Sequence, residues 1–296
     1  MSAAATLTRR ALRSSPAARA ILASPLPRRA ITAARAARVL RPTPRFLAGE
    51  IGARRTGRHG TVDAGVGVHR LGRYRIGGSE RMVHLRHGSR DVEIFNEIFC
   101  PARLSYEPPS EIARELEAMP TLRVADLGGN IGLFGLFALD RWRLEVLRSY
   151  EPDPANAALL QATIAANDTG GRWTLVRAAV SNERTTSSFQ AGLLSESRIA
   201  DDGVGTIEVP VLDLFAEPPV DLLKIDIEGA EWPILDDPRL ASHPARAIVL
   251  EWHRRGCPHA DARAAARELL EAAGYRSLFE GTGESHVNGL MWGLRR

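Results

Sequence analysis

A strand-like segment that runs into a glycine-rich turn and a very apolar helix constrains the fold of this 296-residue chain more than any other feature. Residues 122–127 read LRVADL, which has the length and composition of a buried strand. Residues 128–132 read GGNIG, and residues 133–139 read LFGLFAL, which suits a helix packed on a sheet rather than one facing solvent. The sequence predicts a strand, a tight turn and a buried helix in direct succession.

Strand-like and helix-like segments continue to alternate after this unit. Such alternation predicts an α/β fold with a doubly wound, mainly parallel sheet. In such sheets ligands bind at the carboxyl ends of the strands, so the chemistry of this chain is expected there. Further strands are predicted at residues 144–152, 173–181, 221–229, 246–253, 275–281 and 287–295, and helices at residues 154–167, 230–235 and 260–274.

The first 50 residues differ in composition from the rest of the chain. Residues 1–49 contain ten arginines and no acidic residue, and they are rich in alanine, serine and proline. Because this composition offers little to a core, residues 1–50 are predicted to be a disordered tail that is dispensable for folding. The tail could be an organellar targeting segment, a disordered extension or a start-site artefact. GC-rich coding would produce the 38 arginines and the single lysine, Lys224, and this favours the last two explanations.

Residues 51–120 are predicted to form an N-terminal preamble, and residues 121–296 the main domain. In the preamble, a Gly-Gly pair at residues 77–78 separates two short alternating runs and could close a hairpin. Apolar residues at helical spacing predict two helices, one behind Ser89 and one behind Ser110.

Composition and charge exclude several classes of protein. A hydrophobic content of 44% is enough for a core, and no apolar run reaches the roughly 18 residues of a membrane span. Two cysteines, Cys100 and Cys257, provide no disulfide framework, so a reducing compartment, the cytoplasm, is expected. The pI of 9.6 comes from the first 49 residues, because the rest carries 29 basic against 35 acidic side chains. Nucleic acid is therefore not an expected partner.

The glycine-rich turn does not fit the dinucleotide pattern, which needs glycines at its first, third and sixth positions. The segment here is Asp126-x-Gly128-x-Asn130-x-Gly132, which begins with an acid. Glycines let a ligand approach the backbone closely, and the following helix offers unpaired N–H groups. The leading acid suits a ligand whose amino-acid end is cationic better than it suits a pyrophosphate.

A second acid completes a nucleoside-binding pattern. Glu151 ends the next strand after Asp126, where a carboxylate can accept both hydroxyls of a ribose. Ser181 ends the strand after that and is a further candidate for contact with the cofactor. The glycine loop and these side chains together predict S-adenosyl-L-methionine as the cofactor, because it is a nucleoside with an amino-acid end and no phosphate.

Three acidic residues crowd the end of a later strand, in the segment LLKIDIEGAE. Asp226 and Glu228 are predicted to be catalytic because they lie at the strand terminus, where they could orient an acceptor, take a proton or hold magnesium. Glu231 is expected to be a solvent-facing acid at the start of the following helix. Lys224 is expected to point to the opposite strand face from its two neighbours and to pair locally.

His253 is the candidate general base. It ends a predicted strand beside Glu251, and histidine is the side chain that most often takes a proton from a reacting hydroxyl. A structural hydrogen-bonding role for His253 stays open. Cys257 and His259 follow closely, but no second pair with metal-ligand spacing is visible in the sequence, so zinc is not expected. Magnesium held by Asp226 and Glu228 stays open.

Several segments resemble, in order and spacing, the FkbM family of S-adenosylmethionine-dependent methyltransferases: VADLGGNIGLFG, SYEPDP, RAAVS, VPVLDLF, VDLLKIDIEGAEWPIL and IVLEWH. The resemblance covers residues 81–294, and the segment that contains KIDIEGAE is the most specific. It implies a Rossmann-like class I methyltransferase sheet of seven strands whose last strand is antiparallel. It also implies O-methylation of a hydroxyl on a small-molecule acceptor, a sugar or a secondary metabolite. Neither the identity of that acceptor nor the oligomeric state follows from it.

Two other classes of function remain open at this point. In an N-directed or protein-directed methyltransferase, the neutral amine of the acceptor would need less help from a base. A non-catalytic module would keep only the cofactor pocket. The presence of Asp226, Glu228 and His253 disfavours the non-catalytic module.

Overall fold

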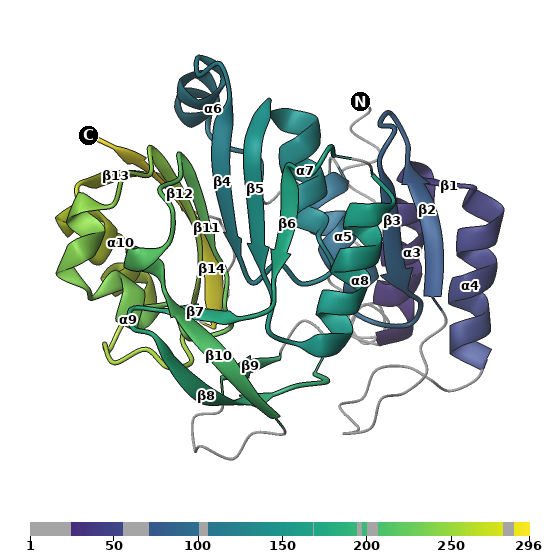
Figure 1. The fold of residues 1–296 in the computed structure, drawn as a ribbon. Helices are drawn as coiled ribbons and strands as arrows, with labels where there is room; N and C mark the ends of the chain where they lie inside the picture. Colours follow the sequence, from purple (N-terminus) through teal and green to yellow (C-terminus); the bar gives the residue numbers. More distant parts are fainter. Residues whose placement is uncertain are drawn as a thin grey trace, which may run out of the picture.

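The computed structural model describes residues 25–55, 71–100, 106–167, 169–193, 197–199, 207–280 and 287–296. Its centre is a sheet of seven strands in the order β13-β14-β12-β11-β4-β5-β6 (Figure 1). These strands are β4 (Leu122–Leu127), β5 (Leu144–Tyr150), β6 (Trp173–Val176), β11 (Leu222–Ile225), β12 (Ala247–His253), β13 (Tyr275–Glu280) and β14 (Asn288–Arg295). Neighbours from β6 to β12 pair in parallel, and β14 is antiparallel to both of its neighbours. The predicted doubly wound sheet with an antiparallel last strand is confirmed.

Both faces of this sheet are buried, which explains why its strands read as nearly continuous apolar runs. Leu222 belongs to the hydrophobic core on one face, and the next residue, Leu223, belongs to the core on the other. Because side chains alternate along a strand, Lys224 points to the same face as Leu222. Parallel pairing sets Lys224 opposite Asp126 of β4, so the two side chains share that face.

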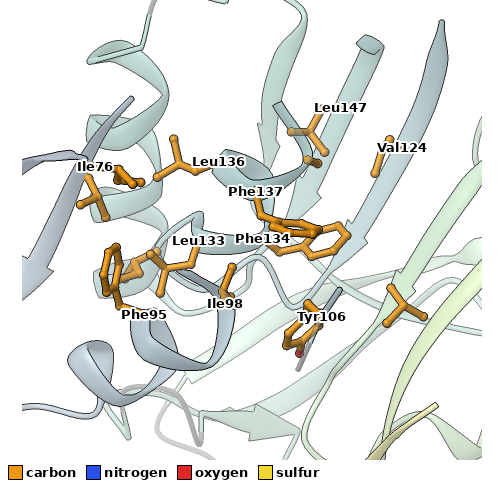
Figure 2. Close-up of a cluster of buried hydrophobic side chains, with 14 of the residues drawn as sticks. Ile76, Phe95, Ile98, Tyr106, Val124, Leu133, Phe134, Leu136, Phe137 and Leu147 are labelled. Atoms are coloured by element: carbon orange, nitrogen blue, oxygen red, sulfur yellow. The ribbon is translucent and has the colours of Figure 1, made fainter. Parts of the chain in front are cut away.

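Helices cover the two faces of the sheet. On one side lie α5 (Asp91–Phe99), α6 (Ser110–Glu117), α7 (Leu133–Arg141) and α8 (Pro154–Ala165), and on the other side α9 (Trp232–Leu235) and α10 (Ala262–Ala272) (Figure 1). Figure 2 shows side chains of α7, among them Leu133 and Phe134, gathered with Phe95 and Ile98 of α5. This packing joins the N-terminal preamble to the core of the main domain.

The structure corrects the predicted boundary of the N-terminal tail at residue 50. The chain forms α3 (Pro25–Val39), β1 (Leu40–Arg41) and α4 (Thr43–Arg55), which pack on the hairpin of β2 (Leu71–Ile76) and β3 (Met82–Arg86). Leu40 and Phe46 have no exposed surface and belong to the same core as α7. Composition was misleading because α3 buries mainly alanines, Ala33, Ala36 and Ala37, instead of large apolar residues. Residues 1–24 lie outside the described residues, so the tail prediction stays a prediction for them.

A buried polar network holds this N-terminal unit together. Oε1 of Glu50 on α4 lies 2.8 Å from Nδ1 of His87, and Nε2 of His87 lies 2.6 Å from the hydroxyl of Tyr74 on β2. All three residues are buried. Buried polar groups are costly unless they are hydrogen-bonded, so this network gives a structural reason for Glu50, the first acidic residue of the chain.

A second, four-stranded sheet follows the third strand of the central one. Its order is β7-β10-β8-β9, with β7 (Ala179–Ser181), β8 (Thr185–Gln190), β9 (Arg198–Ile199) and β10 (Ile207–Asp213). The single strand predicted at residues 173–181 is therefore two strands in two sheets. The chain turns after Val176, where the N–H of Ala178 donates to the Val176 carbonyl at 3.0 Å. The apolar pattern could not reveal this break, because apolar residues precede it and follow it: Trp173 on one side and Ala178, Ala179 and Val180 on the other are all buried.

Both cysteines are free thiols. Cys100 is buried, and its thiol lies 2.8 Å from Oδ1 of Asn96, whereas Cys257 is partly exposed. Within the residue ranges given above, no helix is both long enough and apolar enough to cross a membrane.

Phe46 and Leu47 provide a matched test of the N-terminal packing. Phe46→Ala removes a fully buried ring and should lower the free energy of unfolding by about 3–5 kcal/mol. Leu47→Ala removes the neighbouring side chain, which is 37% exposed, and should cost less than about 1 kcal/mol. Urea denaturation of both variants measures the difference. Small and equal costs would show that α4 does not pack on the core.

A chain that begins at Glu50 should melt at a lower temperature than the full chain. It lacks α3, β1 and half of α4, so the residues that pack on Leu40 and Phe46 become exposed to water. Thermal unfolding followed by circular dichroism gives the comparison. An unchanged melting temperature would restore the prediction that residues 1–50 are a dispensable tail.

Candidate active site

A cavity of about 500 Å³ opens at the carboxyl ends of β4, β5, β11 and β12, the edge at which this topology predicts a ligand. We divide residues of its lining into two groups, the loop half and the acidic half. The loop half consists of Gly128, Gly129, Asn130, Glu151, Pro152, Asn156, Ala178, Ala179 and Val180. The acidic half consists of Tyr106, Lys224, Asp226, Glu228, Glu251, His253 and Asn288.

The glycine loop reaches the cavity because its backbone adopts conformations that most residues avoid. Gly128 has φ +79°, and a Cβ there would lie 1.8 Å from the carbonyl oxygen of Asp226. Asn130 has φ +48°, and asparagine is among the few other residues that tolerate this region. The loop therefore lies directly against the end of β11, which brings the two halves of the cavity together.

Glu151 directly follows β5, and each of its carboxylate oxygens accepts one backbone hydrogen bond. Oε2 accepts from the N–H of Asn130 at 2.7 Å, and Oε1 accepts from the N–H of Asp153 at 2.8 Å. Burial raises the pKa of Glu151 to about 8, although these two hydrogen bonds act in the opposite direction. The carboxylate faces the cavity with lone pairs left to accept hydroxyl groups of a ligand.

Asp153 links the loop half to the second sheet. Its Oδ1 accepts from the N–H groups of Ala155 and Asn156 and thereby caps α8. Its Oδ2 accepts from the N–H of Gly192 at 2.7 Å and from the hydroxyl of Ser197 at 2.8 Å. One buried carboxylate thus holds the start of α8 and the segment before β9 beside the cavity.

Three of the six residues predicted to bind the cofactor line the cavity, namely Gly128, Asn130 and Glu151. Gly132 does not. It precedes α7 with φ +92°, where a Cβ would meet the side chains of Leu160 and Trp173. Ser181 also lies outside the lining, because β7 leaves the central sheet and pairs Ser181 with Asp213 of β10. The contacts of Gly132 with Leu160 and Trp173 indicate that it allows α7 to pack closely, whereas Ser181 belongs to the second sheet.

Asp126, the sixth predicted residue, is completely buried and also lies outside the cavity lining. Its Oδ2 accepts from the hydroxyl of Ser149 at 2.8 Å, and its Oδ1 lies 3.2 Å from Nζ of Lys224. Burial alone would lower the pKa of Lys224, but the charges of Asp226 and Asp126 raise it above its ordinary value. The cation that Asp126 was expected to meet in a ligand is already present in the chain. Direct contact of Asp126 with a cofactor stays a prediction.

All three residues predicted to be catalytic lie in the acidic half. Oε2 of Glu228 is 3.6 Å from Nε2 of His253, and Oε1 of Glu251 is 4.0 Å from the same nitrogen. Glu228 has φ +56°, which costs a residue with a side chain about 1–2 kcal/mol. Strained backbone of this kind clusters at functional sites, and here it turns Glu228 toward the carboxylate of Asp226 and the imidazole of His253.

Glu231 was expected to face solvent, and the structure overturns this expectation. Glu231 has no exposed surface, and its Oε1 lies 2.8 Å from Nδ1 of His253. The same oxygen accepts from the N–H groups of Ile227 and Gly229. The turn after β11 folds over this carboxylate, so that Glu231 fixes the orientation of His253 and leaves Nε2 toward the cavity.

Electrostatics in the acidic half move several pKa values toward or past neutrality. Burial would lower the pKa of His253, but its hydrogen bond to Glu231 and the charges of nearby carboxylates raise it to about 10. Burial and the charge of Asp226 raise the pKa of Glu228 to about 8 and that of Glu251 to about 7. His253 is therefore a cation at neutral pH, and the two glutamates titrate near it.

Sequence reasoning missed two residues that hold the acidic half together. The Tyr106 hydroxyl lies 3.2 Å from Oδ2 of Asp226 and 3.0 Å from Oε2 of Glu251, and Asn288 donates to Oε1 of Glu251 at 2.8 Å. Tyr106 lies outside every strand and helix, so no periodicity marks it. Asn288 pairs in register with His253, and only the strand order brings β14 next to β12.

The helix α5 also contributes to the cavity, through Arg90 beside its first residue and through Ile94, Glu97 and Ile98. These positions share one helical face, and of them only Ile98 belongs to the apolar face that the sequence predicts. The wall combines two aliphatic side chains with a cation and a carboxylate.

Three groups in the acidic half could hold a metal ion. Asp226, Glu251 and His253 each offer one ligand atom, and these atoms lie within 4.8 Å of one another. The predicted magnesium pair was Asp226 with Glu228, so the geometry favours a different set. The ammonium of Lys224, 3.4 Å from Oδ2 of Asp226, already supplies positive charge there. Magnesium stays a hypothesis without support from the comparisons described next.

The strand order, with its one antiparallel strand inserted beside β12 and helices on both faces, defines the Rossmann-like class I methyltransferase fold. Residues 126–277 match the Methyltransferase FkbM domain, which is just over half of the chain. The protein belongs to the FkbM methyltransferase family. The match includes Gly128, Glu151, Asp226 and His253, whereas Tyr106 lies outside it.

Solved structures with similarity to this chain are distant. An FkbM methyltransferase from Methylobacillus flagellatus KT is 16% identical with a TM-score of 0.42, and the alignment covers 68% of this chain and 53% of that one. Magnesium protoporphyrin IX methyltransferase from Synechocystis PCC 6803, solved with bound SAM, is 15% identical with a TM-score of 0.39, over 63% of this chain and 77% of that one. The chain thus spans about half the length of the FkbM methyltransferase. No curated protein matches the sequence.

The contact between Glu231 and His253 predicts a measurable change in titration. Glu231→Gln removes the negative charge beside Nδ1, so the pKa of His253 should fall from about 10 toward its ordinary value. NMR titration of the imidazole proton follows this shift. Asp236→Asn is the control, because Asp236 lies 3.4 Å from His259 instead. An unchanged His253 titration in Glu231→Gln would contradict the geometry.

Proposed function

We propose that the protein is an S-adenosyl-L-methionine-dependent methyltransferase that methylates a hydroxyl group on a small molecule, a sugar or a secondary metabolite. The observation that carries the proposal is the joining of two different halves in one cavity. The loop half offers a carboxylate and backbone groups suited to a nucleoside. The acidic half offers ionisable groups that can take a proton from an acceptor. Membership of the FkbM methyltransferase family supports the class of reaction.

The loop half fits this cofactor by the chemistry of its groups. Glu151 presents a carboxylate to the cavity, as a ribose with two hydroxyls requires. Gly128 and Gly129 present backbone without side chains to the cavity, so a ligand can approach the loop closely. When bound, S-adenosyl-L-methionine supplies an activated methyl group on a sulfonium.

The chain's own contribution to the reaction is positioning and proton transfer. Holding the acceptor oxygen in line with the methyl group can supply about 7–11 kcal/mol of the barrier. We assign the base role to Glu228, because its raised pKa of about 8 lies near the optimum for a general base. His253, oriented by Glu231, places its cationic Nε2 beside Glu228 and stabilises the carboxylate form. This assignment replaces His253 as the predicted base, since a protonated imidazole has no lone pair to accept a proton.

Binding of the nucleoside should depend on Glu151. Glu151→Ala should weaken binding of S-adenosylhomocysteine by about tenfold or more, because the ribose loses the carboxyl group that accepts hydrogen bonds from its hydroxyls. Ser181→Ala should leave the dissociation constant unchanged, because Ser181 lies outside the cavity lining. Calorimetry measures both variants, with NAD as a negative control ligand. Tight NAD binding, or wild-type affinity in Glu151→Ala, would refute the proposed cofactor site.

The pH dependence of kcat should identify the general base. The measurement needs an acceptor, which a screen of glycosides, polyketide-type alcohols and amines for transfer of a labelled methyl group would supply. In the wild type, kcat should rise with pH through about 8 as Glu228 loses its proton. Glu228→Gln should lower kcat by about 100-fold or more and abolish this rise. His253→Ala should move the rise to higher pH, because the imidazolium charge lowers the pKa of Glu228.

The alternative assignments give different results in the same experiment. If His253 is the base, His253→Ala loses about 100-fold at neutral pH and recovers part of it at high pH, while Glu228→Gln retains its pH dependence. Transfer to amines alone would replace the hydroxyl acceptor with an N-directed reaction. Binding of the cofactor without transfer to any compound in the screen would favour a non-catalytic module.

A further inference from the structure

The single lysine of the chain lies in the cavity. The sequence contains 39 basic Lys and Arg residues, and Lys224 is the only lysine among them. It is 3% exposed, in the middle of the central sheet. Every other side chain of this kind in the chain is an arginine.

Four oxygen atoms converge on the ammonium of Lys224. Nζ donates to the carbonyls of Leu127 at 3.0 Å and Gly128 at 2.7 Å, which are the last residue of β4 and the first residue of the glycine loop. It also lies 3.2 Å from Oδ1 of Asp126 and 3.4 Å from Oδ2 of Asp226. The four contacts connect the loop half of the cavity to the acidic half through one atom.

This convergence needs a compact cation. Two carboxylates and two carbonyl oxygens this close would repel one another in a buried site without one. Oδ1 of Asp126 has no hydrogen-bond donor other than this ion-pair contact among the described residues. An ammonium is a point charge that suits such a cluster, whereas the planar guanidinium of arginine presents its donors as a wide fork.

We propose that Lys224 is a positioning residue for the cofactor: its ammonium holds the Leu127 and Gly128 carbonyls so that the glycine loop keeps the shape that binds S-adenosyl-L-methionine. The proposal rests on the proposed function. Gly128 is already constrained by its positive φ and its close approach to Asp226. Lys224 adds the attraction that holds the loop against β11, where repulsion between oxygens would otherwise open it.

A purely structural role must be separated from this one, because Lys224 also neutralises the buried Asp126. Lys224→Met alone should lower the melting temperature, since it leaves that carboxylate unpaired. Asp126→Asn combined with Lys224→Met removes both charges and should recover much of the stability. Asp126→Asn alone is the reference, because it keeps the lysine and lacks only the acid.

Calorimetry with S-adenosylhomocysteine on the full chain decides between the two roles. The double variant should bind about tenfold or more weakly than Asp126→Asn, although the two melt at similar temperatures. Equal affinities would overturn the proposal and leave Lys224 as a counter-charge for Asp126. Failure of the wild type to bind S-adenosylhomocysteine would instead refute the proposed function, and with it this proposal.

Lys224→Arg provides a second test that does not depend on the stability of the double variant. It keeps the charge near Asp126 but cannot place one donor atom among four acceptors. The expected result is weaker binding of S-adenosylhomocysteine, measured well below the variant's own melting temperature so that the protein is fully folded. Wild-type affinity in this variant would show that charge alone is sufficient and would overturn the positioning role.

Discussion

The active-site edge of this protein depends on the ammonium of Lys224 lying among the oxygens of Asp126, Leu127, Gly128 and Asp226. The parallel pairing of β11 with β4 sets Lys224 opposite Asp126, so the sheet itself forms this contact. Gly128 lies directly against the end of β11, and both its carbonyl and Oδ2 of Asp226 contact this cation, at 2.7 Å and 3.4 Å. Without it, the negative ends of the loop and the acidic half would repel each other in a site with little water to screen them.

The residues that line the cavity come from inside and from outside the range that matches the family. The loop half and the carboxylates after β11 lie within the range that matches the FkbM methyltransferase domain. Tyr106, Asn288 and the face of α5 lie outside that range and close the acidic half. The cavity is therefore lined by residues of the matched range together with residues from segments on both sides of it.

The predictions that agreed with the structure depend on neighbouring residues in the sequence. Those that failed depend on contacts between residues far apart in the chain. The strand at residues 122–127 was predicted with its observed bounds, because a run of apolar residues that ends in glycine is a local signal. The burial of Glu231 was not predicted, because Glu231 precedes α9 and its partner His253 lies 22 residues away on β12. The packing of α3 was missed because buried alanines look like tail composition, and Ser181 was assigned to the cavity because the break after Val176 has no apolar signature.

The sequence by itself determined the alternation of strands and helices, the doubly wound sheet, the glycine loop and the acids at the strand ends, since each depends on residues close together in the chain. Only the tertiary structure decided which of these groups meet. Strand order placed Asn288 beside His253, parallel register placed Lys224 opposite Asp126, and the turn after β11 buried Glu231 against the imidazole. Such contacts arise when distant segments share one sheet edge. Their energies depend on how deeply each group is buried and on which charges lie near it, and the order of residues along the chain specifies neither.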